Sequence, residues 1–220
     1  MRTSHKEMRR KINAEVSKIT DEELFSSAAF AAYLTDIAEA VTKRYKRRLR
    51  VETIYDTSEN AMIACTNNRN ILINTGNYIS QSMPYRKLKA ESILGLVGHE
   101  VGHMLFTNFR ISETYFSELS YGRLYPQMEL SEEEQESFTE VTDYFKTGTE
   151  AQKQAIRKAA KLLLNILEDA YIEARICDRY TGRFATGIHL NNIRFTEMMP
   201  SVTEQLTNGC YRFSVFCNLL

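Results

Sequence analysis

The sequence has few of the residues that interrupt regular structure, with three prolines and nine glycines among 220 residues. No segment therefore resembles a flexible linker, and we find no internal repeat or low-complexity tract. The chain is long enough to bury one sizeable hydrophobic core. We expect a single domain over residues 1–220. The apolar run at 213–220 leads us to expect that this domain is a fragment of a longer protein.

Cysteine is also scarce and follows no disulfide or metal-binding pattern. The four cysteines form no C-x-x-C pair and have no regular spacing: Cys65, Cys177, Cys210 and Cys217. This is typical of a reduced, cytosolic chain. The first residues are charged but lack the apolar segment of a secretory signal. No apolar run approaches the length of a membrane span. We therefore expect a cytoplasmic protein that does not contact membranes.

Neither sign of charge is in excess, because 28 basic residues balance 28 acidic ones. The overall charge argues neither for nor against nucleic acid. Two segments are uneven: residues 43–50 are mostly basic, and residues 111–150 hold ten acidic side chains against two basic ones. We expect both to be solvent-exposed faces. We do not expect a nucleic-acid partner, but the acidic segment is a candidate docking surface for a partner protein.

Hydrophobic periodicity and turn residues predict an α+β fold that is mostly helical. We expect helices at about 21–47, 86–107, 131–145 and 150–178, and strands at 50–56, 61–66 and 70–75. The polar residues 67–69 predict a hairpin turn between the last two strands. Three helices begin with a capping-box pair: Thr20 and Glu23, Ser131 and Glu134, and Thr149 and Gln152. We expect irregular structure at 108–130, and loops with short elements after 178.

The most informative segment is LVGHEVGHMLFTN at residues 96–108. On a helix, His99 and His103 are one turn apart on the same face, so both imidazoles can bind one metal ion. Glu100 is rotated by about 100° from His99, which places it beside the ion as a general base. This H-E-x-x-H pattern is found in zinc hydrolases. The alternative is that two structural histidines lie four residues apart by chance.

Two glycines, Gly98 and Gly102, lie within the same predicted helix. A glycine inside a helix costs about 1 kcal/mol relative to alanine. We therefore expect another segment to approach this helix closely, and a strand, a substrate or the helix with the third metal ligand would each fit.

A catalytic zinc needs a third protein ligand, and a carboxylate on the helix at 162–176 is the best candidate. This segment is apolar on nearly all sides, which predicts a buried helix, and a small polar patch interrupts it: Asn165, Glu168, Asp169 and Glu173. We choose Glu168 as the ligand, although spacing alone does not separate it from Asp169. Asp169, Glu173 and Asn165 are then candidate acceptors for a histidine Nδ1 proton. The alternative is that the patch pairs with basic side chains.

HEVGH at 99–103 and NILEDAYIE at 165–173 together resemble the gluzincin metallopeptidases. More narrowly, they are similar to the metallopeptidase domains associated with von Willebrand factor A domains, including the CobT-like group. The resemblance covers about residues 69–176. It implies a zincin-like fold, zinc bound by His99, His103 and Glu168, and Glu100 as the base. The D-x-S-x-S motif of a von Willebrand A domain is missing, since residues 56–60 read DTSEN.

We therefore expect a zinc-dependent metallopeptidase that hydrolyses peptide or protein substrates. The strand at 70–75 is a candidate edge to which an extended peptide could add. Tyr171 and His189 are candidate oxyanion donors, although a structural role is the simpler explanation for each. Two alternatives stay open: a zinc-stabilised interaction domain without turnover, and a chelatase-associated subunit. Glu100 favours the enzyme, because a structural zinc site needs no base.

Overall fold

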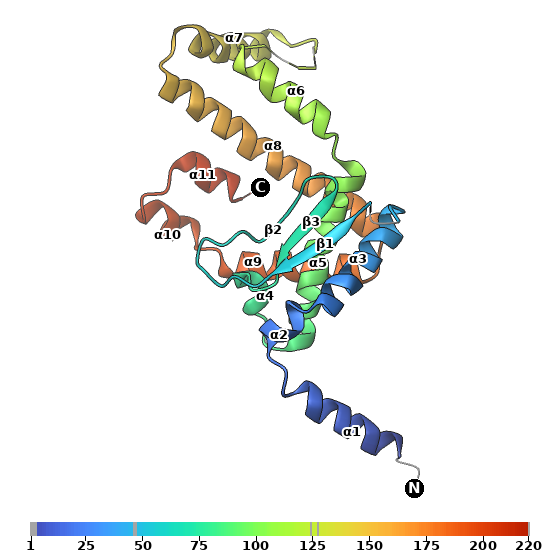
Figure 1. Ribbon diagram of the computed structural model, residues 1–220. Coiled ribbons are helices and arrows are strands. Elements are labelled where there is room, and N and C mark those ends of the chain that lie inside the picture. The colour runs from blue at the N-terminus through green and yellow to red at the C-terminus, as the bar shows by residue number, and fades with distance from the viewer. Residues whose placement is uncertain (1–3, 46–47, 124, 127, 220) are drawn as a thin grey trace. The chain divides into compact units, whose positions relative to one another are not determined.

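The computed structural model describes residues 4–45, 48–123, 125–126 and 128–219. Its fold is α+β and mostly helical, which confirms the predicted class (Figure 1). The strands are β1 (Arg50–Ile54), β2 (Ala64–Thr66) and β3 (Asn70–Asn74). The helices are α1 (His5–Val16), α2 (Asp21–Phe25), α3 (Ala28–Thr42), α4 (Tyr78–Gln81), α5 (Arg86–Phe106), α6 (Phe109–Ser120), α7 (Glu132–Thr147), α8 (Glu150–Arg179), α9 (Arg183–Met198), α10 (Val202–Thr207) and α11 (Arg212–Cys217).

The chain divides into two compact units. Residues 1–105 and 172–199 form the first unit, which contains the sheet, and residues 106–171 and 200–220 form the second. Helix α8 runs through the boundary without a break. The prediction of one domain over residues 1–220 stays a prediction.

The three strands form a mixed sheet in the order β1-β3-β2, seen side by side in Figure 1. β2 and β3 pair antiparallel around the turn at residues 67–69, which confirms the predicted hairpin. β1 pairs parallel with β3. The strand predicted to be an edge is therefore the central one, and that expectation is wrong. Ile71 and Ile73 of β3 are fully buried, as suits a strand with a partner on each side.

Helix α5 packs closely against α9, because α5 has small residues at the contact. A Cβ atom on Gly95 would overlap with the backbone of Gly187 in α9. A Cβ on Gly98 would lie 2.9 Å from the Phe184 ring. The close neighbour that we expected at Gly98 is therefore α9, a helix that was not predicted from the sequence.

The predicted secondary structure differs from the observed one in three places. The helix expected at 21–47 is interrupted, because the Ser27 side chain accepts from Phe30 N and begins α3 as a new helix. Residues 108–130, expected to be irregular, contain the 12-residue α6, which Asn108 caps. The region after 178, expected to be loops, contains the 16-residue α9. Neither α6 nor α9 has the capping-box pair that marked the other helices.

Helix α8 is much less buried than its composition suggests. Its only buried residues are Ile172 and Ile176. Leu162, Leu167 and Tyr171 are 40%, 61% and 52% exposed. The prediction of a buried helix at 162–176 is therefore wrong over most of that range. Its carboxylates are partly open to water, so their burial does not by itself require a cation.

The charged segments have more structure than expected. Most of the acidic segment at 111–150 forms α6, which was not expected, and α7, which was. In the basic segment, the Arg44 guanidinium donates to the carbonyl oxygen of Asn68 at 2.6 Å and to that of Met104 at 3.2 Å. Met104 is in the last turn of α5, so Arg44 satisfies a carbonyl that has no partner within the helix.

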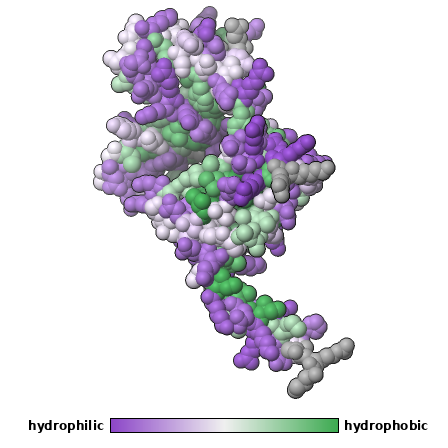
Figure 2. Space-filling view, in the orientation of Figure 1, coloured by the Kyte–Doolittle hydropathy of each residue, from purple (hydrophilic) through white to green (hydrophobic). Residues whose placement is uncertain are grey.

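Helix α1 has no buried residue. Its apolar side chains Met8, Ile12 and Val16 are 52%, 55% and 43% exposed and follow one face of the helix, and they contribute to the green strip on α1 in Figure 2. The segment after α1 is held to α5 by Arg86, which donates to the carbonyl oxygens of Val16 and Ile19. Within the described ranges, no helix combines the length and apolarity that a bilayer crossing needs.

Candidate metal centre

The two histidines of the motif lie on one face of α5, as their spacing predicts. The ring centroids of His99 and His103 are 4.9 Å apart and the rings are inclined by 77°. Both residues are half-buried. Two imidazoles in this arrangement can direct one nitrogen each toward a shared ion.

The carboxylate that joins them is Asp169 of α8. One ligand atom from each of His99, His103 and Asp169 lies within 4.8 Å of the others, so this group could hold a metal ion. Ligand atoms around a tetrahedral zinc are roughly 3.3 Å apart, so small side-chain movements would close the group on an ion. Two imidazoles and one carboxylate are a donor set that suits zinc.

Close packing of α8 against α5 brings Asp169 to this position. A Cβ atom on Gly102 would lie 3.1 Å from Ile176 Cγ1 and 3.2 Å from Ile172 Cδ1. Asp169 lies one turn before Glu173 on the same unbroken helix. The expectation that Gly102 admits the helix with the carboxylates therefore agrees with the packing.

A second carboxylate of α8 orients the first histidine. Nδ1 of His99 lies 2.8 Å from Oε1 of Glu173. Because an ionised carboxylate only accepts hydrogen bonds, Nδ1 of His99 is the donor. Nε2 is then the nitrogen that can bind metal. The other oxygen of Glu173, Oε2, accepts from Nδ2 of Asn192 at 2.8 Å.

Glu100 lies at the buried side of the motif and is 5% exposed. Its charge acts on strand β2: burial raises the pKa of the Cys65 thiol, and the Glu100 carboxylate raises it further. β2, the strand that contains Cys65, is an edge of the sheet.

The remaining predicted residues are not part of the group of three. Glu168, chosen from the sequence as the third ligand, is half-buried, but Asp169 is the residue whose carboxylate lies with the histidines. Asn165 is exposed on α8. Of the candidate oxyanion donors, Tyr171 is 52% exposed and His189 is exposed on α9.

Two residues were not predicted from the sequence: Asn192 and Cys65. No pattern in the sequence pointed to Asn192, because α9 was not predicted and Asn192 is not part of either motif. Cys65 was examined only for disulfide and metal spacing, although its strand was predicted next to the helix with the motif.

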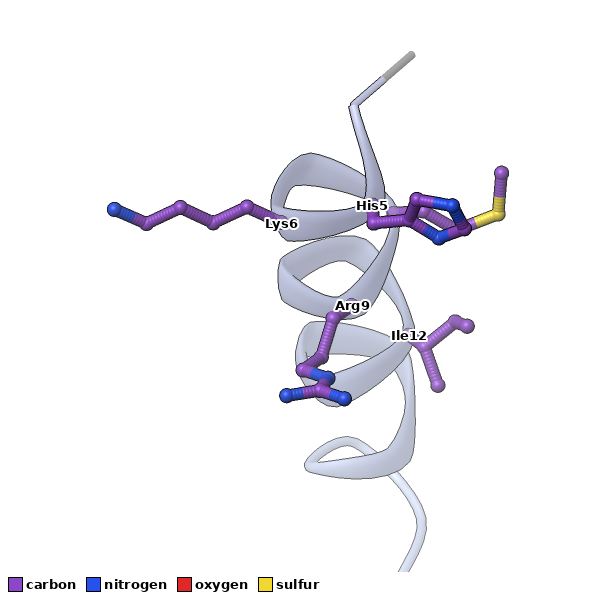
Figure 3. A pocket seen from close by; sticks show the side chains of 5 residues that line it. His5, Lys6, Arg9 and Ile12 are labelled. Carbon is purple, nitrogen blue, oxygen red and sulfur yellow. The ribbon is translucent and has the colours of Figure 1, made fainter.

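Two hollows lie apart from this centre. One is lined by residues of α1 alone; in Figure 3, His5 and Ile12 point to one side of that helix and Lys6 points away from them. The other is a hollow of about 730 Å³ in the second unit, lined mainly by residues 118–138. Neither includes a residue of the H-E-x-x-H motif.

Comparison of the chain with protein-family models, with curated proteins and with solved structures finds no match. The assignment of a function therefore depends on the geometry and chemistry of the centre itself.

Proposed function

We propose that this protein is a zinc-dependent metallopeptidase of the H-E-x-x-H type that acts in the cytoplasm. The observation that carries the proposal is a buried carboxylate next to a group that could hold a metal. Glu100 is 5% exposed and directly follows His99, whose ligand atom lies within 4.8 Å of those of His103 and Asp169. A purely structural metal site would have no use for a buried carboxylate at this position.

His99, His103 and Asp169 are the residues that hold the zinc in this proposal. Three protein ligands leave one tetrahedral position open, as in catalytic sites. Bound zinc would polarise a substrate carbonyl and make water acidic enough to react near neutral pH. Glu173 orients His99 through the hydrogen bond at Nδ1, so that Nε2 is presented with its lone pair.

Glu100 is the general base. It accepts one proton from water as the water oxygen bonds to the carbonyl carbon of the peptide. It then delivers that proton to the amide nitrogen as the carbon–nitrogen bond breaks, so the amine leaves neutral. Glu100 follows His99 directly, so its side chain leaves α5 about 100° away from the histidine face. From there it can reach a water molecule or a substrate without acting as a metal ligand.

An extended peptide is the substrate that the sheet favours. β2 is an edge strand, and its Cys65 lies within the electrostatic influence of Glu100. A peptide that adds to β2 through main-chain hydrogen bonds would therefore pass close to the base. This replaces β3, the strand predicted from sequence, which already has a partner on each side.

Hydrolysis of an unfolded protein such as reduced casein tests the proposal, with purified untagged protein and one equivalent of zinc. Glu100→Gln is expected to lower turnover by about 10²–10⁴-fold, the usual contribution of a general base. Its zinc content should equal that of the wild type. Glu91→Gln is the matched control, because Glu91 is on the same helix and its side chain forms an ion pair with Lys87 at 3.8 Å.

Equal turnover by the wild type and Glu100→Gln, with zinc bound to both, would contradict the peptidase. The centre would then be a non-catalytic zinc site in an interaction domain or a chelatase-associated subunit. Absence of zinc from the wild type after reconstitution would reject the metal centre itself.

A further inference from the structure

Helix α9 contributes a side chain that lies outside both sequence motifs. Nδ2 of Asn192 donates to Oε2 of Glu173 at 2.8 Å, while Oε1 of the same carboxylate lies 2.8 Å from Nδ1 of His99. We propose that Asn192 is a positioning residue. It holds the Glu173 carboxylate and thereby sets the tautomer and ring orientation of His99. The inference deepens the metal centre proposed above and rests on it.

Two hydrogen bonds fix the orientation of the Glu173 carboxylate more firmly than one would. The terminal torsion of a glutamate is broad, so a carboxylate with a single partner can rotate and weaken that contact. Glu173 is 22% exposed at its side chain, so water competes for its oxygens. A donor from a second helix opposes both effects, because it occupies the oxygen that His99 does not use.

A neutral donor is the right chemistry for this role. A lysine or arginine at the position of Asn192 would pair with Glu173 and reduce the negative field that favours a proton on Nδ1 of His99. An amide N–H holds the carboxylate without adding charge. The carboxylate therefore keeps its full effect on the basicity of the histidine ligand.

Helix α9 is held in place by contacts on both sides of Asn192. Nδ2 of the adjacent Asn191 donates to the carbonyl oxygen of Ser92 in α5 at 3.0 Å. Two residues further on, Nε of Arg194 donates to Oγ of Ser82 at 2.8 Å. The glycine crossing of α5 and α9 fixes the rotation of α9 and directs Asn192 toward α8. The two hydrogen bonds add stability to this packing.

The first test is zinc affinity, measured by competition with a chromophoric chelator. Loss of a residue that orients a metal ligand costs about 10–100-fold in affinity, which we expect for Glu173→Ala. Asn192→Ala acts one hydrogen bond further from the metal and should weaken zinc binding by about 3–10-fold, which is less than that range. Asn192→Asp would place a second carboxylate against that of Glu173 and should weaken zinc binding more than Asn192→Ala does.

A double-mutant cycle separates this role from general destabilisation. If Asn192 acts through Glu173, then Asn192→Ala should have no further effect on zinc affinity in the Glu173→Ala background. Asn191→Ala is the matched control: it removes a buried hydrogen bond from the same helix and should lower thermal stability without changing zinc affinity. Additive losses in the cycle, or equal losses of affinity in Asn191→Ala and Asn192→Ala, would overturn the proposal.

A second measurement does not need zinc. The ¹⁵N shifts of the His99 ring in the metal-free protein at alkaline pH report which nitrogen carries the proton. Asn192→Ala should reduce the Nδ1–H population, and Asn191→Ala should not. An unchanged population in Asn192→Ala would overturn the role of Asn192. If the wild type binds no zinc, the metallopeptidase fails, and the tautomer comparison still decides whether Asn192 positions His99.

Discussion

Gly95 of α5 and Gly187 of α9 bring two helix backbones into direct contact, because a Cβ atom on either glycine would overlap with backbone atoms of the other helix. This crossing explains why α5 tolerates a glycine in its interior. It also positions α9, and with it Asn192, next to the carboxylate that contacts His99.

Gly95→Ala should lower the free energy of unfolding by about 1–3 kcal/mol, the usual range for overpacking a core. The gain in helix propensity, about 1 kcal/mol, is too small to offset a backbone overlap. Urea denaturation measures the change. Gly102→Ala is the matched substitution on the same helix: its methyl group would meet only side-chain atoms, the nearest at 3.1 Å, so the loss should be smaller. Equal stability of Gly95→Ala and the wild type would show that the two helices do not cross as described.

The grouping of His99, His103 and Asp169 predicts which carboxylate of α8 binds zinc. Asp169→Asn should weaken zinc binding by more than about 100-fold, since even loss of a residue that only orients a ligand costs about 10–100-fold. Glu168→Gln should leave binding close to that of the wild type. Elemental analysis and chelator competition on untagged protein decide between them. The reverse result would restore the ligand implied by the gluzincin resemblance.

The ion pairs of Asp21 predict that the free energy of unfolding falls in acid. Burial raises the pKa of Asp21, but hydrogen bonds and charges from Lys89 and Arg86 outweigh it, so the pKa lies below its ordinary value. Oδ1 lies 2.6 Å from Nε of Arg86 and Oδ2 lies 2.8 Å from Nζ of Lys89. The stability from these pairs is present above the unfolded pKa of about 3.9. It is lost as pH falls through the lower folded pKa.

Asp21→Asn should therefore lower the free energy of unfolding by about 1.5–3 kcal/mol near neutral pH, as for hydrogen bonds to charged groups. The difference from the wild type should shrink below about pH 4. Urea denaturation at both pH values measures it. Glu22→Gln, an exposed neighbour on α2, serves as the control. A difference that is the same at both pH values would contradict the role of the Asp21 charge.

Cys65 reports on the electrostatics of the proposed base. Burial raises the pKa of the Cys65 thiol and the Glu100 carboxylate raises it further. Removing that charge in Glu100→Gln lowers the pKa, so more thiolate is present at a given pH above neutrality. Iodoacetamide should then modify Cys65 faster in Glu100→Gln than in the wild type. Peptide-level mass spectrometry follows the rate, with the exposed Cys210 as an internal reference. Equal rates at Cys65 would place Glu100 too far from β2 for the proposed peptide site.

Local signals in the sequence predicted the elements that local interactions stabilise. The capping boxes at Thr20 and Ser131 occur with both hydrogen bonds in place, and each begins a helix. The β-rich runs at 61–66 and 70–75 and the polar turn residues 67–69 between them predicted the hairpin of β2 and β3. Helices α6 and α9 were missed because neither begins with a capping-box pair: a single Asn108 side chain caps α6, and α9 is held by its packing against α5.

The burial of α8 could not be predicted from its composition. Leu162 and Leu167 make the helix apolar on nearly all sides, yet both are at least 40% exposed. Composition measures how much apolar surface a helix offers, whereas burial depends on what packs against it. The same limit explains the edge strand: the pattern of β3 is that of a buried strand, but only its pairing with β1 made it central.

The sequence by itself determined the two histidines on one helix face and the carboxylate beside them, because a helix places residues one and four positions apart at known angles. Only the tertiary structure decided which carboxylate of α8 joins them. Glu168 and Asp169 are adjacent in sequence and leave the helix in directions about 100° apart. Packing of Ile172 and Ile176 against Gly102 sets the rotation of α8, and this rotation directs Asp169 toward the histidines and Glu173 toward Nδ1 of His99.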